Sequence, residues 1–322
     1  MAIARQDVLV VGAGPTGLLL ALWLHRLGVS VRIIDRMPRP GTASRALGVQ
    51  ARTLEIYRQL GIADRVVKLG LEFTAANIWV RGRKRARAAF GEMGKGISPY
   101  PYMLILLQDV HERVLEDTLA GLGLIVERDT ELVGFEQDAH GIAATLRHAG
   151  GAAGRCEAAY LAGCDGARSL VRETIGAGFP GGTYAHRFYV ADAVVRGPVA
   201  NGELHVALDD DDFLAAFPMP GEGHVRLIGT VRAEAENAPM PQWQDVSTIV
   251  LRRLGVTVQL VNWFSTYQVH HRVAGHFRDR RVFLLGDAAH IHSPVGGQGM
   301  NTGLADATNL GWKLAAVLQG RA

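Results

Sequence analysis

Near its start the chain has an apolar run that leads into a glycine-rich turn. The segment "DVLVVGAG", residues 7–14, is typical of a buried strand that ends in glycines. Residues 15–28 have the pattern of a helix, with Pro15 in its first turn and Gly28 just past its end. The segment "VSVRIID", residues 29–35, has the pattern of a second strand. Together these segments predict a β-α-β unit of about thirty residues.

The rest of the chain divides into helical and strand-like patterns around a β-rich middle. Residues 183–270 alternate short apolar runs with turns, as the strands of an antiparallel sheet do. A buried strand running into a loop returns at 280–287. The other predicted elements are helices at 51–61, 108–123 and 297–320, and strands within 70–107, 124–148 and 158–169. The pattern predicts an α/β fold, in which a Rossmann-like nucleotide-binding part is interrupted by an antiparallel β-sheet domain.

Composition and charge narrow the possible functions. The chain has 322 residues, of which 48% are apolar and 20% are charged, so it is long enough for one large or two modest globular domains. A net charge of +3 is too small to argue for binding to nucleic acid. The longest apolar runs fall well short of the roughly 18–20 residues of a membrane span, and the first one enters a glycine turn rather than a cleavage site.

The two cysteines, Cys156 and Cys164, are expected to be small buried side chains in a reducing cytoplasm, because two cysteines in a chain of this length make no disulfide framework. Their surroundings offer no histidines or further cysteines at zinc-like spacing, so no metal site is predicted there. We therefore expect a cytoplasmic protein that contains no metal.

Two charge runs have alternative interpretations. The segment "RGRKRAR", 81–87, is either a solvated hairpin or a landing patch for an anionic cofactor or substrate. The segment "DDDD", 209–212, is expected to cap a turn between strands, since adjacent acids on one loop rarely converge on a metal unaided.

The glycine turn "GAGPTG", 12–17, carries the first candidate site. Gly12, Gly14 and Gly17 fit the dinucleotide-binding spacing, in which glycines allow a tight turn, approach of a pyrophosphate and close packing of a helix. Asp35 ends the next predicted strand, where an acid binds ribose hydroxyls. An acid at this place also disfavours a 2′-phosphate, because the two anions would repel each other.

Two further glycine turns follow strands. In "GCDGARS", 163–169, Asp165 and Gly166 could form a plain turn, and Arg168 adds a cation beside it. In "GDAAHIHSPVGGQGMN", 286–301, Asp287 can accept hydrogen bonds from a polyol. The helix predicted to follow offers backbone N–H groups to an anion. The acid suits the ribityl chain of a flavin, and the helix start suits the negative charge that a reduced flavin ring carries.

These three segments, in this order along the chain, resemble those of the class A FAD-dependent aromatic hydroxylases, the para-hydroxybenzoate hydroxylase-like family. The segment "ASRALGVQARTLEIYRQLGI", 43–62, resembles the branch that contains polyketide and phenol hydroxylases. The resemblance extends from about residue 5 to about residue 320. It implies a GR2-type FAD-binding fold with an inserted substrate domain. The domain parts it implies are 1–72, 108–182 and 271–322 for FAD, 73–107 for strands near substrate and flavin, and 183–270 for substrate.

The resemblance also implies which residues contact the cofactor. The implied FAD contacts are Gly12, Gly14, Pro15, Thr16 and Gly17 at the pyrophosphate, Asp35 and Arg36 at the adenosine ribose, Arg45 and Gln108 near phosphate and ribityl, Asp287 at the ribityl chain, and Pro294, Gly297, Gln298, Gly299, Met300 and Asn301 beside the flavin ring. Asp165, Gly166 and Arg168 are implicated in handling both FAD and NAD(P)H, and Leu132 in lining the adenine pocket.

The activity implied by the resemblance is hydroxylation of a small aromatic, phenolic or polyketide-like substrate. In this family NADH or NADPH reduces FAD, and a hydroperoxide at flavin C4a then transfers one oxygen atom. The catalytic side chain stays open: Pro294 and Gly297 are candidates only by their expected closeness to the flavin. His270 and His271 are expected to belong to a strand. The candidate pocket residues, each of which could equally belong to the core, are Trp79, Tyr102, Tyr189, Phe213 and Phe217.

Two alternatives remain from the sequence. A flavoprotein of this fold could do other redox work, or a truncated relative could be non-catalytic. Family members continue past the helix at 297–320, whereas this sequence ends at Ala322. If the helix end were uncovered, its apolar residues Leu314, Ala315, Val317 and Leu318 would favour a homodimer or another protein partner.

Overall fold

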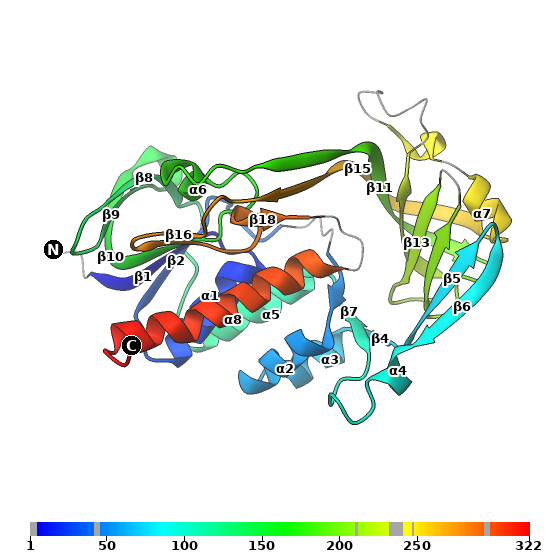
Figure 1. Ribbon diagram of the computed structural model, residues 1–322, viewed down its shortest axis with the longest axis horizontal. Coiled ribbons are helices and arrows are strands. Elements are labelled where there is room, and N and C mark those ends of the chain that lie inside the picture. Colours follow the sequence, from blue (N-terminus) through cyan, green and yellow to red (C-terminus); the bar gives the residue numbers. More distant parts are fainter. Residues whose placement is uncertain (1–4, 42–45, 210–211, 232–240, 247, 293–296) are drawn as a thin grey trace. The chain divides into compact units, whose positions relative to one another are not determined.

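The computed structural model describes residues 5–41, 46–209, 212–231, 241–246, 248–292 and 297–322, and it divides into two compact units (Figure 1). The first unit contains Met1–Ala46, Leu107–Gly182 and His271–Ala322, and the second contains Leu47–Leu106 and Thr183–His270. Each unit is thus assembled from segments far apart in the sequence. The assignment of the predicted domain parts to FAD and to substrate stays a prediction.

The first unit is built on a largely parallel sheet with the strand order β16-β17-β10-β1-β2. Its strands are β1 (Gln6–Val11), β2 (Val31–Ile34), β10 (Ala153–Gly163), β16 (Arg278–Asp279) and β17 (Val282–Leu284). Val11 is in register with both Ile34 and Gly163, and Gly163 is in register with Leu284. The carboxyl ends of four strands therefore meet at one edge of the sheet. The three glycine-rich segments follow three of these ends.

Three helices pack together beside this sheet: α1 (Pro15–Arg26), α5 (Gln108–Gly121) and α8 (Gln298–Leu318). α1 contacts both of the others and is apolar on nearly all sides, with five leucines that are fully buried. Each fully buried leucine contributes about 1.5–3 kcal/mol relative to an exposed one. Gly311 of α8 lies against Trp23 of α1, whose indole N–H donates to Thr308 Oγ1 at 3.2 Å.

The expectation of an exposed apolar face at the end of α8 is wrong for two of its four residues. Leu314 and Ala315 are buried, because α8 packs lengthwise on α1 and directs this face to it. Val317 is exposed and Leu318 is half-buried. The exposed aromatic residue of this helix is Trp312, which was not among the residues expected to be exposed.

An antiparallel meander extends the sheet of the first unit beyond β10. It consists of β8 (Glu131–Gln137) and β9 (Ile142–Arg147), joined by a tight turn at "DAHG", 138–141. Leu132 belongs to the apolar core beneath it, among side chains from β10 and β17. The short helix α6 (Leu170–Thr174) follows β10, and β18 (His290–Ile291) pairs with Arg272 and Val273 at the end of β15.

The second unit contains a sheet with the order β15-β11-β14-β13-β12-β5-β6. The strands are β5 (Ala75–Val80), β6 (Arg83–Ala89), β11 (Gly181–Arg196), β12 (Leu204–Leu208), β13 (Phe213–Pro218), β14 (His224–Thr230) and β15 (Thr257–Val273). The pairings β11–β14, β14–β13, β13–β12 and β5–β6 are antiparallel, whereas β12 and β5 are parallel. The predicted α/β fold class, with an inserted, mainly antiparallel sheet, is confirmed.

Smaller elements complete the second unit. Its other elements are β3 (Gly48–Val49), α2 (Ala51–Gln59), α3 (Ala63–Leu69), β4 (Leu71–Phe73), α4 (Phe90–Met93), β7 (Met103–Ile105) and α7 (Ile249–Arg253). The order β3-β7-β4 forms a small antiparallel sheet. α7 covers one face of the large sheet through Val250, Leu251 and Leu254. In the part of the chain that the structure describes, no helix has the length and apolarity needed to cross a membrane.

The basic run at 81–87 forms the turn before β6 and most of β6 itself, at the outer edge of this sheet. Arg87 is paired with Glu203 at 2.6 Å, and the side chains of Arg83, Lys84 and Arg85 are exposed. Charged side chains on an edge strand discourage pairing with other chains, which agrees with the solvated interpretation.

Candidate active site

The glycine turn between β1 and α1 is shaped by close backbone contacts. Gly12 has φ +103°, and a side chain there would overlap the carbonyl oxygen of Cys164. A side chain at Gly17 would overlap the carbonyl oxygen of Gly12. At Gly14, by contrast, a methyl group would meet no atom within 4 Å. The turn is closed on its inner side and open at Gly14, the position where a pyrophosphate would approach.

The start of α1 offers backbone donors at this open side. Gly14 is its N-cap residue and makes no side-chain cap, and Pro15 has no N–H group to offer. The N–H groups of the next residues, Thr16 and Gly17, precede the first intrahelical hydrogen bond, which Leu18 donates to Gly14. Uncapped donors at a helix N-terminus suit a phosphate.

Asp35 closes the glycine turn from the end of β2. Its Oδ2 accepts a hydrogen bond from the N–H of Ala13 at 2.7 Å, and its Oδ1 accepts one from Met37 at 2.8 Å. Arg128 also lies near this carboxylate, with Nη1 3.9 Å from Oδ2. A carboxylate can accept about four hydrogen bonds, so Asp35 keeps acceptor capacity for a ribose hydroxyl. Arg36, the neighbouring candidate, is exposed. The structural role of Asp35 was not evident from the sequence.

Thr16 connects the glycine turn at 12–17 with the glycine-rich segment 286–301 and the helix that follows it. A side chain at Gly286, which has φ +55°, or at Gly303 of α8 would come within contact distance of Thr16 Oγ1. Thr16 therefore packs into a space that two glycines leave open. The start of α1, the loop after β17 and the body of α8 meet at this one side chain.

Asp165 in the Asp-Gly segment organises its own turn. Its carboxylate accepts hydrogen bonds from Ser169 Oγ at 2.5 Å and from the N–H of Val171 at 3.2 Å. Burial raises the pKa of this carboxyl, and these hydrogen bonds lower it. Gly166 has φ +80°, and the side chain of Arg168 is exposed. Asp165 thus holds the start of α6, and Arg168 is the charged group of this segment that a ligand could reach.

Arg172 connects the segment 163–169 with the segment 286–301, and it was not among the residues predicted from the sequence. Its buried guanidinium donates to the carbonyl oxygens of Ala288 at 3.0 Å and of Ala167 at 2.8 Å. It also lies 3.8 Å from the centre of the Phe179 ring, a cation–π contact. A signal was present in the sequence, since an arginine inside the apolar segment "SLVRETI" needs a buried partner.

Replacing Arg172 by methionine is expected to lower the free energy of unfolding by about 2–4 kcal/mol, because two buried carbonyl groups lose their donor. Urea denaturation followed by circular dichroism measures this loss. The exposed Arg168 provides the matched control, and Arg168→Met should change stability by less than about 0.5 kcal/mol. Equal stability of the two variants would contradict the bridging role of Arg172.

Asp287 lies on the short 3-10 turn Gly286–Ala288, just past β17. Its side chain is exposed, and it makes no hydrogen bond to any other residue that the structure describes. Although the side chain can be reached by solvent, the protein atoms packed near it partly desolvate the carboxylate and so raise its pKa, an effect that His290 and His292 partly offset. A carboxylate at the strand ends with unused acceptors fits the hydroxyls of a ribityl chain.

The start of α8 supplies the remaining candidate contacts. Gly297 is its N-cap in the left-handed conformation, with no side-chain cap. Asn301 is buried and donates through Nδ2 to the carbonyl oxygen of Gly297 at 2.8 Å. Met300 Sδ lies 3.3 Å from Nδ1 of His111, a buried side chain of α5 whose pKa burial lowers to about 4. This neutral histidine therefore packs against the first turn of α8 through its contact with Met300.

The other predicted residues of the first unit differ in how well they can be placed. Gln108 begins α5 and donates to Glu112 at 2.8 Å. Gln298 and Gly299 lie in the first turn of α8, where the Gln298 side chain is exposed. Arg45 and Pro294 lie outside the described residues, so their predicted contacts stay predictions.

The aromatic candidates of the second unit lie on opposite faces of its sheet. Tyr189 packs in the core beneath α7, edge-on to Trp243 and stacked on Phe264. Trp79 packs against the same core, and its indole N–H donates to Nδ1 of His205 at 2.9 Å. For these two residues the structure agrees with the core alternative left open by the sequence.

Phe213 and Phe217 point to the other face, because they alternate with the core residues of β13. On this face Phe188 lies edge-on to Phe213, with ring centres 6.3 Å apart, and is stacked on Tyr267 at 6.1 Å. Tyr102 belongs to a separate aromatic pair with Tyr100, and burial raises its pKa to about 12. Phe217 packs against a separate core cluster, which contains Phe73. The partly exposed rings on the face that α7 leaves uncovered are thus those of Phe188, Phe213 and Tyr267.

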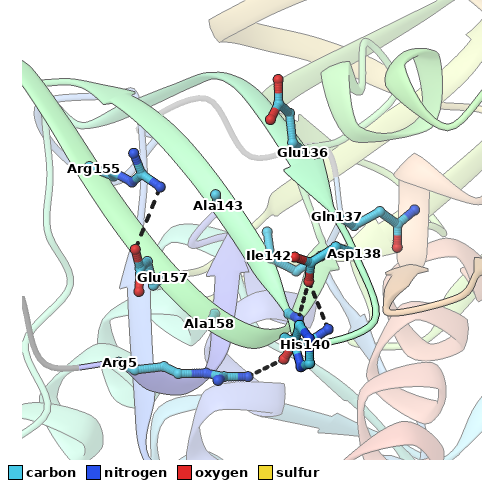
Figure 2. A pocket seen from close by; sticks show the side chains of 11 residues that line it. Arg5, Glu136, Gln137, Asp138, His140, Ile142, Ala143, Arg155, Glu157 and Ala158 are labelled. Atoms are coloured by element: carbon cyan, nitrogen blue, oxygen red, sulfur yellow. Dashed lines mark hydrogen bonds and ion pairs between the residues drawn. The ribbon is translucent and has the colours of Figure 1, made fainter.

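A polar cavity of about 350 Å³ lies away from these motifs (Figure 2). It is lined by the meander β8–β9, by β10 and by Arg5, which directly precedes β1 at the level where Gln6 is in register with Ala158. That is the amino end of the parallel strands, opposite the edge where the glycine turns meet. Several of its polar groups already have partners, since Arg155 pairs with Glu157 and Asp138 accepts from the N–H of His140. It is therefore separate from the candidate active site.

A parallel sheet that brings a dinucleotide-type turn and two acids to the ends of its strands defines a nucleotide-cofactor-binding fold. A family model described as an FAD binding domain matches residues 5–322. The chain belongs to this family, that of the class A flavin-dependent aromatic hydroxylases.

Related proteins agree with this membership. The chain is 38% identical over 318 residues to 6-methylpretetramide 4-monooxygenase of Streptomyces rimosus, covering 98% of this chain and 57% of that protein. p-Nitrophenol 4-monooxygenase from Pseudomonas putida has a similar structure, with a TM-score of 0.86, 26% identity and coverage of 99% and 81%. Aklavinone-11 hydroxylase, solved with FAD and aklavinone, has a TM-score of 0.82 and 28% identity, with coverage of 100% and 64%. The chain thus spans little more than half the length of the first of these relatives.

Proposed function

We propose that this protein is an FAD-dependent monooxygenase that hydroxylates a phenolic or polyketide-like aromatic substrate with NADH or NADPH and O₂. The observation that carries the proposal is the convergence of the turn at Gly12–Gly17, Asp35 and Asp287 at one edge of the parallel sheet. Related monooxygenases whose names specify aromatic substrates support the reaction class.

In this proposal different residues at the sheet edge bind different parts of FAD. The open turn at Gly14 and the start of α1 bind the pyrophosphate, and Asp35 binds the ribose. Asp287 accepts hydrogen bonds from the ribityl hydroxyls. The uncapped start of α8 stabilises negative charge on the pyrimidine side of the flavin ring. FAD itself supplies the redox and oxygen chemistry.

The substrate is proposed to be an aromatic compound that packs on the rings of Phe188, Phe213 and Tyr267. Flat apolar rings recognise another ring by stacking and edge-on contacts. Asp35 disfavours a 2′-phosphate at the glycine turn, so that turn is assigned to FAD rather than to NADPH. The given sequence has a single dinucleotide-type turn, so it offers no second site of this kind for the nicotinamide cofactor.

One assay tests the proposal against its alternatives. Purified protein is mixed with FAD, with NADH or NADPH, and with a panel of phenols and larger phenolic ring systems. We expect nicotinamide oxidation that a substrate stimulates, with matching oxygen uptake and a hydroxylated product identified by mass spectrometry. Bound flavin without stimulated oxidation would indicate other redox work, and absence of flavin binding would indicate a non-catalytic relative.

A further inference from the structure

A carboxylate on α8 holds the turn that carries Asp287. Asp306 Oδ2 accepts a hydrogen bond from the N–H of Gly286 at 3.0 Å, and it lies 2.7 Å from Nε2 of His290. Gly286 directly precedes Asp287, and His290 follows it by three residues. One oxygen atom on the helix therefore fixes both ends of the turn.

The ring of His290 is held in one orientation by its neighbours. It stacks on Phe277, with ring centres 5.9 Å apart, and on His292, at 6.3 Å. The backbone of His290 pairs with Val273 in the short ladder between β18 and β15. The side chain is largely buried, with 12% of its surface exposed. Because the ring cannot turn away from α8 without breaking these contacts, its charge acts directly on Asp306.

Several charged groups surround this histidine. Asp306 faces it from α8, and Asp287 acts on it from the turn it flanks. Further charged or titratable groups on the packed elements include His292 beyond β18, His271 and Arg272 of β15, His276 beside Phe277, and Arg172 of α6, which binds the carbonyl oxygen of Ala288. The two carboxylates are the groups that favour the charged form of His290.

We propose that Asp306 and His290 are positioning residues for Asp287, and that FAD binding weakens when His290 loses its charge. The inference rests on the proposed role of Asp287 in holding the ribityl chain. It adds two residues outside the cofactor contacts and a dependence of cofactor affinity on pH.

The direction of the pH dependence follows from the surroundings of His290. The hydrogen bond with Asp306 raises the pKa of this histidine above its usual value, and burial opposes the shift. A raised pKa in the folded state means that the stabilisation is complete below about pH 6.5 and is lost as the pH rises through the folded value. The turn, and with it the acceptor for FAD, is therefore held most firmly in mildly acidic solution.

The test is FAD affinity of the full chain, measured by quenching of flavin fluorescence from about pH 6 to about pH 9. We expect the dissociation constant of the wild-type protein to rise about fivefold over this range, the effect of losing one partly buried ion pair. His290→Gln keeps a donor toward Asp306 but cannot titrate, so its dissociation constant should be flat. His140→Gln, the same change on an exposed turn, should keep the wild-type pH profile.

A flat profile for the wild-type protein, or an unchanged profile for His290→Gln, would overturn the inference. Histidine NMR titration of the wild-type protein and of Asp306→Asn gives a second measurement should the glutamine variant fail to fold. The pKa of His290 should fall when Asp306 becomes Asn, and an unchanged value would also overturn the inference. Absence of FAD binding at every pH would instead refute the proposed function, so the two failures are distinguishable.

Discussion

Gly12→Ala is expected to lower the free energy of unfolding of the cofactor-free protein by about 3 kcal/mol or more. Two costs add at this position. The backbone has φ +103°, which a residue with a side chain rarely adopts, and the new methyl group would overlap the carbonyl oxygen of Cys164. The oxygen belongs to the backbone next to β10, so the sheet itself would have to shift. Urea denaturation without FAD measures the loss.

Gly14→Ala is the matched control, two residues further along the same turn. Gly14 has φ −75°, and a methyl group there meets no protein atom within 4 Å. The variant should unfold at the wild-type urea concentration but bind FAD about tenfold more weakly, because the methyl group occupies the approach of the pyrophosphate. Loss of stability in Gly14→Ala, or wild-type stability in Gly12→Ala, would contradict this division between structural and ligand-facing glycines.

The part of the fold around the glycine turn could be predicted from the sequence because its signals are local. Turn residues, strand pattern and helix pattern occur together between residues 7 and 35, and the β-α-β unit forms where they indicate. Asp287 could be placed at a strand end for the same reason. The sequence could not show that Asp35 also binds the N–H of Ala13, since that contact depends on the exact separation of two strands.

Contacts between distant segments account for what the sequence left undecided. The sequence indicates that Arg172 needs a buried partner, but it does not show that this partner is the turn at Ala288, more than a hundred residues later. Which face of β11 is buried depends on where α7 packs, so Tyr189 could not be assigned to pocket or core beforehand. The parallel pairing of β12 with β5 likewise joins segments whose order in the sheet no local pattern encodes.

Asp287→Ala is expected to weaken FAD binding by about 10- to 100-fold, the effect of losing hydrogen bonds to an ionised acceptor. Stability without FAD should not fall. A carboxyl whose pKa is raised in the folded state opposes folding above that pKa, so its removal relieves a small penalty at neutral pH. Equilibrium dialysis against FAD and thermal denaturation of the cofactor-free protein measure the two effects.

Asp165→Ala separates a ligand-facing acid from a structural one. Asp165 also lies just past a strand end and also has a raised pKa, but its oxygens already accept from Ser169 and Val171. Its loss should lower stability without FAD by about 1–3 kcal/mol, since both donors lose their acceptor. If Asp287→Ala instead lost stability and kept wild-type affinity for FAD, Asp287 would be a second structural acid, and the ribityl chain would need a different acceptor at the carboxyl ends of the strands.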